Sequence, residues 1–391
     1  MKLLKLTADG LPLFNGKLEL VFYAQQRVRD EEKENLYQLF SNVYLNPANA
    51  FIGINASGKT SVLKVILLTM GILDNAPINH IAAKDILSES EKVTLNSFFY
   101  IESTKEICRL ETVIVSSKSK TDGIIYKILS ESLWTKKINE VTTRKGMLAF
   151  DKNPPVMVRS DQEVFLPDDV SIIIAKNKKT GEQTNAVSML LFTNINVLPF
   201  SEDIPLEVLT YLDPTIESLH FEEKSKKPVI HLKFKDKEEI ILNTPHELNN
   251  YLSSGTVKGM ITFTFAQEVL KNGGYLVVDE IENHLNKEIV GTLMRFFMDM
   301  RLNKNGGTLI FTTHYPELLD EYDCNDSIYI TRNLNGISAK NLMHILKRND
   351  IKKSDAYQSG FLQGTMPTYE SYMQLKKSIA ASLKCNKSIC I

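Results

Sequence analysis

The sequence is short of the residues that build covalently braced or repetitive proteins. It has 4 cysteines, 18 glycines and 13 prolines in 391 residues. Four scattered cysteines do not make a disulfide framework, and Cys385 and Cys390 have no cysteine pair or histidine nearby that would complete a zinc site. The low glycine and proline content excludes collagen-like and low-complexity architectures. The remaining composition, 43% hydrophobic, is that of a globular protein with room for about two or three domains.

The sequence also lacks a large net charge and a long apolar run. Lys and Arg number 46 against 47 Asp and Glu, a formal charge of -1. The net charge therefore gives no electrostatic attraction of the whole chain to DNA or to a membrane, although a local basic surface is still possible. The longest apolar stretch, residues 62–73, is interrupted by Lys64 and Gly71, and the N-terminus has no signal-peptide core. We therefore expect a soluble cytoplasmic protein without a membrane partner.

The first 250 residues mix α/β and antiparallel β patterns. Residues 50–54 form an apolar run that leads through a glycine turn into a buried type of helix. Three β-rich stretches within residues 93–129 predict an antiparallel meander. Short helices are expected over residues 186–192 and 206–212, and a hairpin over residues 229–242.

Strands and helices alternate again after residue 255. Expected in order are a helix over 256–271, a buried strand over 275–278, a helix through Leu285 and Phe297 that ends near Asn305, and strands over 308–313 and 328–330. Such alternation is typical of a mainly parallel sheet.

One segment matches a phosphate-binding loop. Residues 53–60 read GINASGKT, the pattern G-x-x-x-x-G-K-[ST], between the expected strand and helix. Backbone N–H groups of such a loop hold phosphate oxygens, the lysine adds a charge at the β- and γ-phosphates, and the last hydroxyl ligates Mg²⁺. The expected nucleotide contacts are Gly53, Asn55, Ala56, Ser57, Gly58, Lys59 and Thr60, and Thr60 is also the expected Mg²⁺ ligand.

Acidic residues and a histidine follow two of the later strands. Asp279 and Glu280 end an apolar strand, where a parallel sheet presents its ligands. Alone they would be solvated surface acids, but with the phosphate loop upstream we expect Asp279 to hold the Mg²⁺ shell and Glu280 to polarise the attacking water. His314 ends the next strand and is expected to reach the γ-phosphate or orient that water. Glu282 either joins this acidic cluster or stays a surface acid.

A serine-glycine turn opens the helix that precedes the Asp-Glu strand. Ser253 suits the N-cap of that helix. In a functional interpretation, the helix N-terminus with Ser253, Ser254 and Gly255 also forms a second phosphate receptor. Because it would lie on a different face from the phosphate loop, it would serve the nucleotide of another subunit.

These four elements, in this order, resemble the ATPase heads of the ABC class: P-loop, LS-x-G signature, Asp-Glu strand and histidine switch. The split head on one chain looks like the RecF and OLD (overcoming-lysogenization-defect) branch. The tail, with Arg348-Asn349-Asp350 and Gly364-Thr365-Met366-Pro367, is similar to abortive-infection ATPases of the AbiLi and RloA type, relatives of the PARIS ATPase. The resemblance implies a prokaryotic ATPase that binds and hydrolyses ATP with Mg²⁺, dimerises through sandwiched ATP and controls a separate toxic effector, a nuclease or another toxin, during phage infection.

The resemblance and the order of elements together predict the architecture. We expect an α/β fold: a P-loop NTPase with an ABC-ATPase-like head, built on a mainly parallel sheet, an antiparallel β subdomain and an inserted mixed α/β lobe. The expected division is 1–130 for the N-terminal part of the head, 131–215 for the lobe, 216–345 for the C-terminal part of the head, and 346–391 for a tail. The expected assembly is a homodimer or a higher oligomer of dimers.

Two departures from the ABC pattern bear on the alternatives. Ala56 stands where such loops often carry glycine, and it is small enough to fit. No glutamine occurs between Thr60 and Asp161, where an ABC head carries its Q-loop. Gln162 is the first glutamine, so the residue that couples the γ-phosphate to the second lobe is unassigned.

The missing Q-loop glutamine and the large insertion argue against the energy subunit of a membrane transporter. A nuclease within the chain is not expected, because too few residues follow His314. A DNA-repair or chromosome-maintenance ATPase of the RecF or SMC kind that clamps nucleic acid is the alternative to a defence switch.

The phosphate loop makes a first testable prediction. Replacing Lys59 with alanine removes the mobile cation of the phosphate cradle, so ATP binding should be lost or nearly lost. Equilibrium dialysis with labelled ATP measures this directly. Unchanged affinity in the Lys59→Ala variant would count against a phosphate role for residues 53–60.

Overall fold

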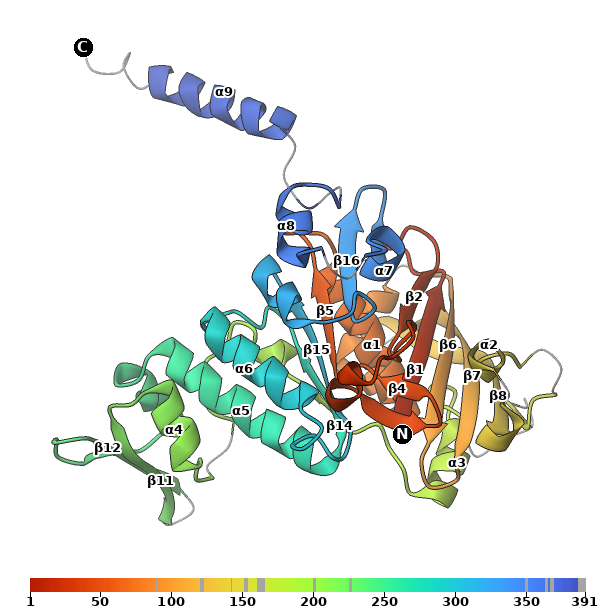
Figure 1. The fold of residues 1–391 in the computed structure, drawn as a ribbon, viewed down its shortest axis with the longest axis horizontal. Helices are drawn as coiled ribbons and strands as arrows, with labels where there is room; N and C mark the ends of the chain where they lie inside the picture. The colour runs from red at the N-terminus through yellow and green to blue at the C-terminus, as the bar shows by residue number, and fades with distance from the viewer. Residues whose placement is uncertain are drawn as a thin grey trace.

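Two six-stranded sheets, with helices between and outside them, form the body of the protein (Figure 1). The computed structural model describes residues 1–88, 90–119, 123–141, 143–150, 154–159, 166–199, 202–224, 227–348, 351–362, 365 and 369–385. Gln162 and parts of the tail, Asn349, Asp350, Gly364, Met366 and Pro367 among them, lie outside these residues. No helix of the described residues is long and apolar enough to cross a membrane.

The central sheet is mainly parallel, as the alternating pattern predicted. Its strands, in spatial order, are β10 (Ala186–Ser188), β14 (Gly274–Val278), β15 (Gly307–Thr313), β5 (Ala48–Ile52), β16 (Ile328–Asn333) and β17 (Ile337–Asn341). All neighbouring pairs are parallel except β16 and β17. The β5, β14 and β15 strands lie side by side, so their carboxyl ends meet at one edge of the sheet.

Both faces of this sheet are buried, which explains its continuous apolar strands. In β14, Tyr275 and Val277 pack into the core that contains α1 (Lys59–Leu73), whereas Leu276 and Val278 pack into the core on the other face. That second core is closed by α5 (Ser254–Asn272) and α6 (Lys287–Met298). Alternate residues of one strand thus support the two helical layers.

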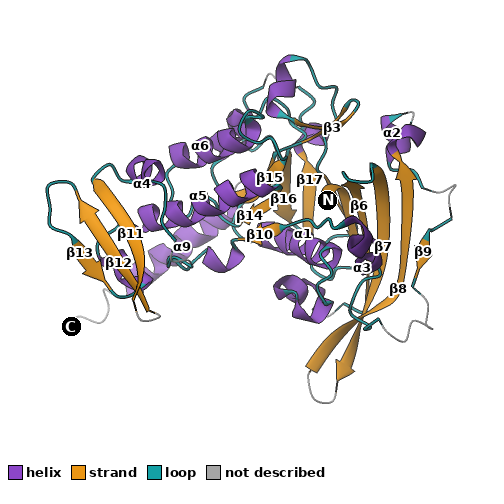
Figure 2. Ribbon diagram, turned by 90° about the horizontal axis from the view of Figure 1, so that it is seen from below, coloured by secondary structure: helices purple, strands orange, loops and turns teal. Residues whose placement is uncertain are grey.

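The second sheet is antiparallel and lies on the far side of α1 from α5 and α6 (Figure 2). Its order is β2 (Leu18–Val21), β1 (Lys2–Asp9), β6 (Lys92–Ile101), β7 (Glu106–Ser119), β8 (Gly123–Lys137) and β9 (Met157–Val158). The β6, β7 and β8 strands are the predicted meander, which continues past residue 129 to Lys137. α1 is therefore enclosed between the two sheets.

Smaller elements surround these layers. The predicted hairpin is formed by β12 (Lys227–Phe234) and β13 (Ile240–Leu242). An additional strand that was not predicted, β11 (Ile216–Lys224), pairs with β12 and completes a three-stranded sheet. The helix before it, α4 (Leu206–Leu212), has the predicted bounds. The β3 (Tyr37–Phe40) and β4 (Val43–Leu45) strands form a separate ribbon. The other helices are α2 (Arg144–Met147), α3 (Ile173–Thr180), α7 (Leu342–Ile345), α8 (Lys353–Gln358) and α9 (Tyr369–Cys385). α9 stands apart from the body in Figure 1.

Short 3₁₀ helices connect many of these elements. They are η1 (Glu31–Asn35), η2 (Ile78–His80), η3 (Ala82–Leu87), η4 (Ile138–Glu140), η5 (Leu190–Phe192), η6 (Pro245–Asn250) and η7 (Pro316–Glu321). Two of them, η3 and η5, lie beside α1 and the end of β10 and become important below.

Two predictions of secondary structure were wrong. Residues 186–192 are not a helix: β10 pairs with β14 from Ala186 to Ser188, and only η5 is helical. An open edge of the sheet, invisible in a local pattern, outweighs the helical preference of this segment. The helix through Phe297 ends at Met298 rather than near Asn305, because the chain turns toward the start of β15.

The division into domains stays a prediction. β8 runs through the expected boundary at residue 130, and β10, from the expected lobe, pairs within the central sheet. Both facts place parts of residues 131–215 against the head.

Candidate functional site

The predicted phosphate loop, acids and histidine follow the ends of three neighbouring parallel strands. The loop at residues 53–58 joins β5 to α1, Asp279 and Glu280 follow β14, and His314 follows β15. Because these strands lie side by side, the structure brings all of these residues to one edge of the sheet (Figure 1).

The backbone of the phosphate loop needs its glycines. Gly58 has φ +93°, and a Cβ there would come within 2.5 Å of the Ile337 side chain. A Cβ on Gly53 would meet the Ser57 hydroxyl at 2.4 Å. Ala56 also has a positive φ, 60°, a conformation that turns successive N–H groups into one concavity. The loop thus has the shape of an anion cradle, and Ala56 fits where glycine is common.

Lys59 lies at the centre of the loop. Its Nζ donates to the carbonyl oxygens of Gly53 (3.0 Å) and Ile54 (3.3 Å) and lies 3.5 Å from His314 Nδ1. Burial lowers the pKa of Lys59, and the carboxylates of Glu280 and its acidic neighbours oppose that shift. The ammonium group is therefore held between the loop and the acids, where phosphate oxygens could replace the two carbonyl contacts.

Asp279 connects three elements of the site. Its Oδ2 accepts from the Thr60 hydroxyl at 2.7 Å, and its Oδ1 accepts from the Thr312 hydroxyl at 2.6 Å. A hydroxyl and a carboxylate at hydrogen-bonding distance are the hard oxygen donors that Mg²⁺ prefers, usually together with phosphate oxygens. The residues present therefore fit the expected metal: Thr60 and Asp279 would hold Mg²⁺, which would neutralise phosphate charge.

Glu280 is held in an uncommon backbone conformation beside Asp279. Its φ is +48°, a strained value for a residue with a side chain, and its N–H donates to Thr312 Oγ1 at 2.7 Å. Glu280 Oε1 lies 3.9 Å from His314 Nε2. The two residues expected to act on the water thus face the same space.

Sequence reasoning missed Thr312 and left Glu282 undecided. Thr312 is fully buried, and its hydroxyl contacts both Asp279 and the Glu280 backbone. Glu282 Oε1 accepts from the His314 N–H at 2.5 Å, and its Oε2 is buried without a hydrogen-bond partner among the described residues. Glu282 is therefore part of the cluster and holds the histidine. The polar residues in the otherwise apolar strand TLIFTT were the available signal for Thr312.

The serine-glycine turn is where the sequence predicted it, at the start of α5. Ser253 Oγ accepts from the Thr256 N–H at 3.0 Å, an N-cap. A Cβ on Gly255 would lie 2.5 Å from the His284 carbonyl oxygen, so the turn packs tightly on the loop after Glu280. Within the described residues, the Ser253 hydroxyl bonds to Thr256, the Ser253 carbonyl accepts from Val257 and the Ser254 carbonyl accepts from Asn196, and none of these hydrogen bonds reaches the phosphate loop.

A cavity of about 720 Å³ opens at the acidic cluster. Glu280 and Asp279 line one end. The walls are formed by one face of α1, by residues at the start of η3 and by the segment that includes the end of β10. From α1 and the residue after it come Thr60, Lys64, Leu67, Gly71 and Asp74; from η3 and the residue before it come Ile81, Ala82 and Ala83; and from the third segment come Ser188, Leu190, Leu191, Thr193 and Asn194. Ser188, at the carboxyl end of β10, thus faces the site from the strand next to β14. No glutamine lines this cavity among the described residues.

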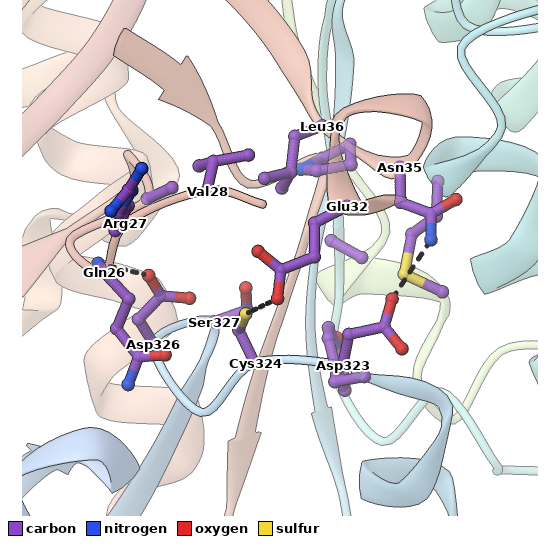
Figure 3. Close-up of a pocket in the computed structure, with 15 residues that line it drawn as sticks. Gln26, Arg27, Val28, Glu32, Asn35, Leu36, Asp323, Cys324, Asp326 and Ser327 are labelled. Atoms are coloured by element: carbon purple, nitrogen blue, oxygen red, sulfur yellow. Dashed lines mark hydrogen bonds between the residues drawn. The ribbon is translucent and has the colours of Figure 1, made fainter. Parts of the chain in front are cut away.

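A second cavity lies at the opposite edge of the central sheet, near the start of β5 (Figure 3). Asp326 accepts there from the Gln26 N–H at 3.3 Å, and Cys324 Sγ donates to Glu32 Oε1 at 3.4 Å. Its volume is about 40 Å³, room for a few water molecules and not for a nucleotide. This second cavity therefore does not compete with the edge that carries the phosphate loop.

The shared hydroxyl of Thr312 makes a testable prediction. Thr312→Val keeps the shape but leaves Asp279 Oδ1 and the Glu280 N–H without this partner, and hydrogen bonds to charged groups contribute about 1.5–3 kcal/mol. ATP turnover should fall by roughly tenfold to a hundredfold. Thr313→Val is the matched control, because within the part of the chain that the structure describes the Thr313 hydroxyl bonds only to the Tyr315 N–H. Equal turnover in the two variants would contradict the role given to Thr312.

Comparison with known proteins concerns the family and the fold of the chain. A family profile described as "AAA domain, putative AbiEii toxin, Type IV TA system" matches residues 201–320, which include the turn at Ser253, the two acids and His314. None of the curated proteins matches. Among solved structures, "Crystal structure of the SmcHead bound to the C-winged helix domain of ScpA" is similar at 15% identity, covering 89% of this chain and 100% of that chain, with a TM-score of 0.48; this likeness supports no inference about function. The mainly parallel central sheet, with the phosphate-loop pattern between β5 and α1, has the layout of a P-loop NTPase, and residues 201–320 are similar to the AAA domain of that family.

Proposed function

We propose that this protein is an ATP-driven switch: it binds and hydrolyses ATP with Mg²⁺, dimerises through sandwiched ATP and controls a separate effector. The observation that carries the proposal is the convergence of Lys59, Thr60, Asp279, Glu280 and His314 at one edge of the sheet. A phosphate cradle, a metal-binding pair and a candidate base in contact with each other serve phosphoryl transfer to water.

Each residue of this cluster has a distinct part in the proposed reaction. The loop amides and Lys59 bind the β- and γ-phosphates, and Thr60 and Asp279 hold Mg²⁺. Glu280 accepts the proton of the attacking water. His314, oriented by Glu282 through its backbone, lies between Lys59 and Glu280 and contacts the transferred phosphate.

The proposal of a dimer rests on the turn at the start of α5. Its N-cap serine and helix N-terminus are suited to phosphate oxygens, yet within one chain this turn contacts the loop after Glu280 and not the phosphate loop. A second copy, facing the first, would bring this turn to the γ-phosphate of its partner. Each ATP would then contact both copies, in a homodimer or in a larger assembly of dimers.

The effector is proposed from the resemblance of the tail and from the name of the matching family, which refers to a toxin and a toxin–antitoxin system. We propose a role in anti-phage defence, in which the ATP state of the dimer holds or releases a nuclease or another toxin encoded separately.

The experiment that tests the switch uses Glu280→Gln. Glutamine keeps the shape but cannot accept a proton, so hydrolysis should fall by about 10²–10⁴-fold. Lys59, Thr60 and Asp279 remain, so ATP should still bind, and removing one negative charge beside the γ-phosphate should favour the closed state. We expect closed dimers to accumulate with Mg-ATP, measured by size-exclusion chromatography with light scattering.

A second substitution controls for the geometry of the dimer. Ser253→Arg in the Glu280→Gln background should spare ATP binding but block the ATP-dependent increase in mass, because the arginine fills the receptor offered to the partner. A mass that does not respond to ATP in Glu280→Gln itself would contradict a hydrolysis-gated dimer. Wild-type turnover in that variant would show that Glu280 is not the base.

The alternative function, a clamp on nucleic acid, requires a basic surface. In α3, Lys176 is paired with Glu106 at 2.5 Å, and Lys178 and Lys179 lie in the last turn, where they stabilise the helix end. We therefore predict no steep salt dependence of duplex DNA binding, measured by fluorescence anisotropy over a salt series. A log–log slope that corresponds to several phosphate contacts would favour the clamp instead.

A further inference from the structure

The segment that follows β10, residues 189–196, is in contact with the candidate site. Its start is fixed to β14 by a hydrogen bond from the Met189 N–H to the Val277 carbonyl oxygen at 2.8 Å. Leu190, Leu191, Thr193 and Asn194 line the cavity that also contains Thr60, Asp279 and Glu280. A change in what occupies that cavity therefore acts directly on this segment.

A buried lysine holds the same segment from the other side. Lys258, one turn into α5, is 1% exposed, and its Nζ donates to the Phe192 carbonyl oxygen. No carboxylate forms an ion pair with it among the described residues, and burial lowers its pKa to about 8. Burying an ammonium group without a counter-charge is costly, and a methionine would fill the same space with apolar atoms. Packing alone therefore does not require a lysine at this position.

Three more contacts join residues 189–196 to the elements around the serine-glycine turn. Asn196 Nδ2 donates to the Ser254 carbonyl oxygen at 2.9 Å. The Phe192 and Phe265 rings, the latter on α5, lie 6.2 Å apart between centroids. Asn283 Nδ2, from the loop after Glu280, donates to the Thr193 carbonyl oxygen at 2.6 Å. The segment is thus tied to the start of α5 and to the acidic loop at once.

We propose that Lys258 is a positioning residue for the reaction: by holding the Phe192 carbonyl group it fixes residues 189–196 to α5, so that occupancy of the cavity beside Thr60 sets the placement of the Ser253–Gly255 turn. This deepens the proposed function and rests on it. The link passes through three hydrogen bonds to backbone carbonyl groups: Lys258 of α5 donates to Phe192, Asn283 donates to Thr193, and Asn196 donates to Ser254 at the start of α5. Lys258 itself touches neither the phosphate loop nor the acids.

The test compares Lys258→Met with Lys271→Met. Both replace a lysine of α5 with a side chain of similar length, and Lys271 is exposed near the end of the helix. For Lys258→Met we expect the affinity for ATP to stay within about twofold of wild type. We expect kcat and the equilibrium constant for ATP-dependent dimerisation to fall by about tenfold, a typical size for coupling between sites. Lys271→Met should match wild type in all three measurements. A purely structural role would weaken ATP binding together with turnover.

Asn196→Ala gives an independent measurement, because it breaks the link at the other end and removes no buried charge. Asn196→Ala should lower kcat and leave the affinity for ATP unchanged. The double variant with Lys258→Met should have the same kcat as Lys258→Met alone, because both side chains join residues 189–196 to α5 and their effects should not add. If Lys258→Met does not fold, Asn196→Ala decides by the same criterion.

Two results would overturn the inference: turnover of Lys258→Met equal to that of Lys271→Met, or a loss of ATP affinity as large as the loss of turnover. Wild-type protein that neither binds ATP nor changes mass with it would instead contradict the proposed function. Wild-type protein that does both, with Lys258→Met behaving identically, would contradict the role of Lys258 alone.

Discussion

The site depends on one carboxylate that joins three elements. Asp279, at the end of β14, accepts hydrogen bonds from Thr60 at the start of α1 and from Thr312 in β15. Its burial would be costly without these partners. Because Thr312 also accepts from the Glu280 N–H, the same contact sets the strained turn that presents Glu280. The positions of the metal-binding pair and of the candidate base are therefore coupled.

The central sheet makes that contact available. Parallel pairing of β5, β15 and β14 aligns their carboxyl ends, and the apolar residues of both faces lock the register. α1 is held between the two sheets, so the first turn of the helix, with Lys59 and Thr60, cannot move away from the acids. The antiparallel sheet carries none of the candidate residues, but it packs against α1 and so helps to hold the helix in place.

Around this rigid centre the protein places a more adaptable layer. The segment after β10 is short of regular structure, lines the cavity and is held by the side chains of Lys258 in α5 and Asn283 in the acidic loop. A segment attached to two parts through a few hydrogen bonds can shift between arrangements more easily than a packed strand. This is the physical basis for relating the nucleotide site to the turn at Ser253.

The sequence by itself determined the phosphate loop, the two acids, the histidine, the serine-glycine turn and most strands of the central sheet. Each is local: a glycine turn, an N-cap or a buried strand is specified by its own residues and near neighbours. The tertiary structure alone decided that residues 186–188 form a strand, that Glu282 and Thr312 belong to the cluster, and that Lys258 reaches Phe192. These contacts join residues 32 to 89 positions apart, and such pairings depend on which elements become neighbours in the fold, which no local pattern specifies.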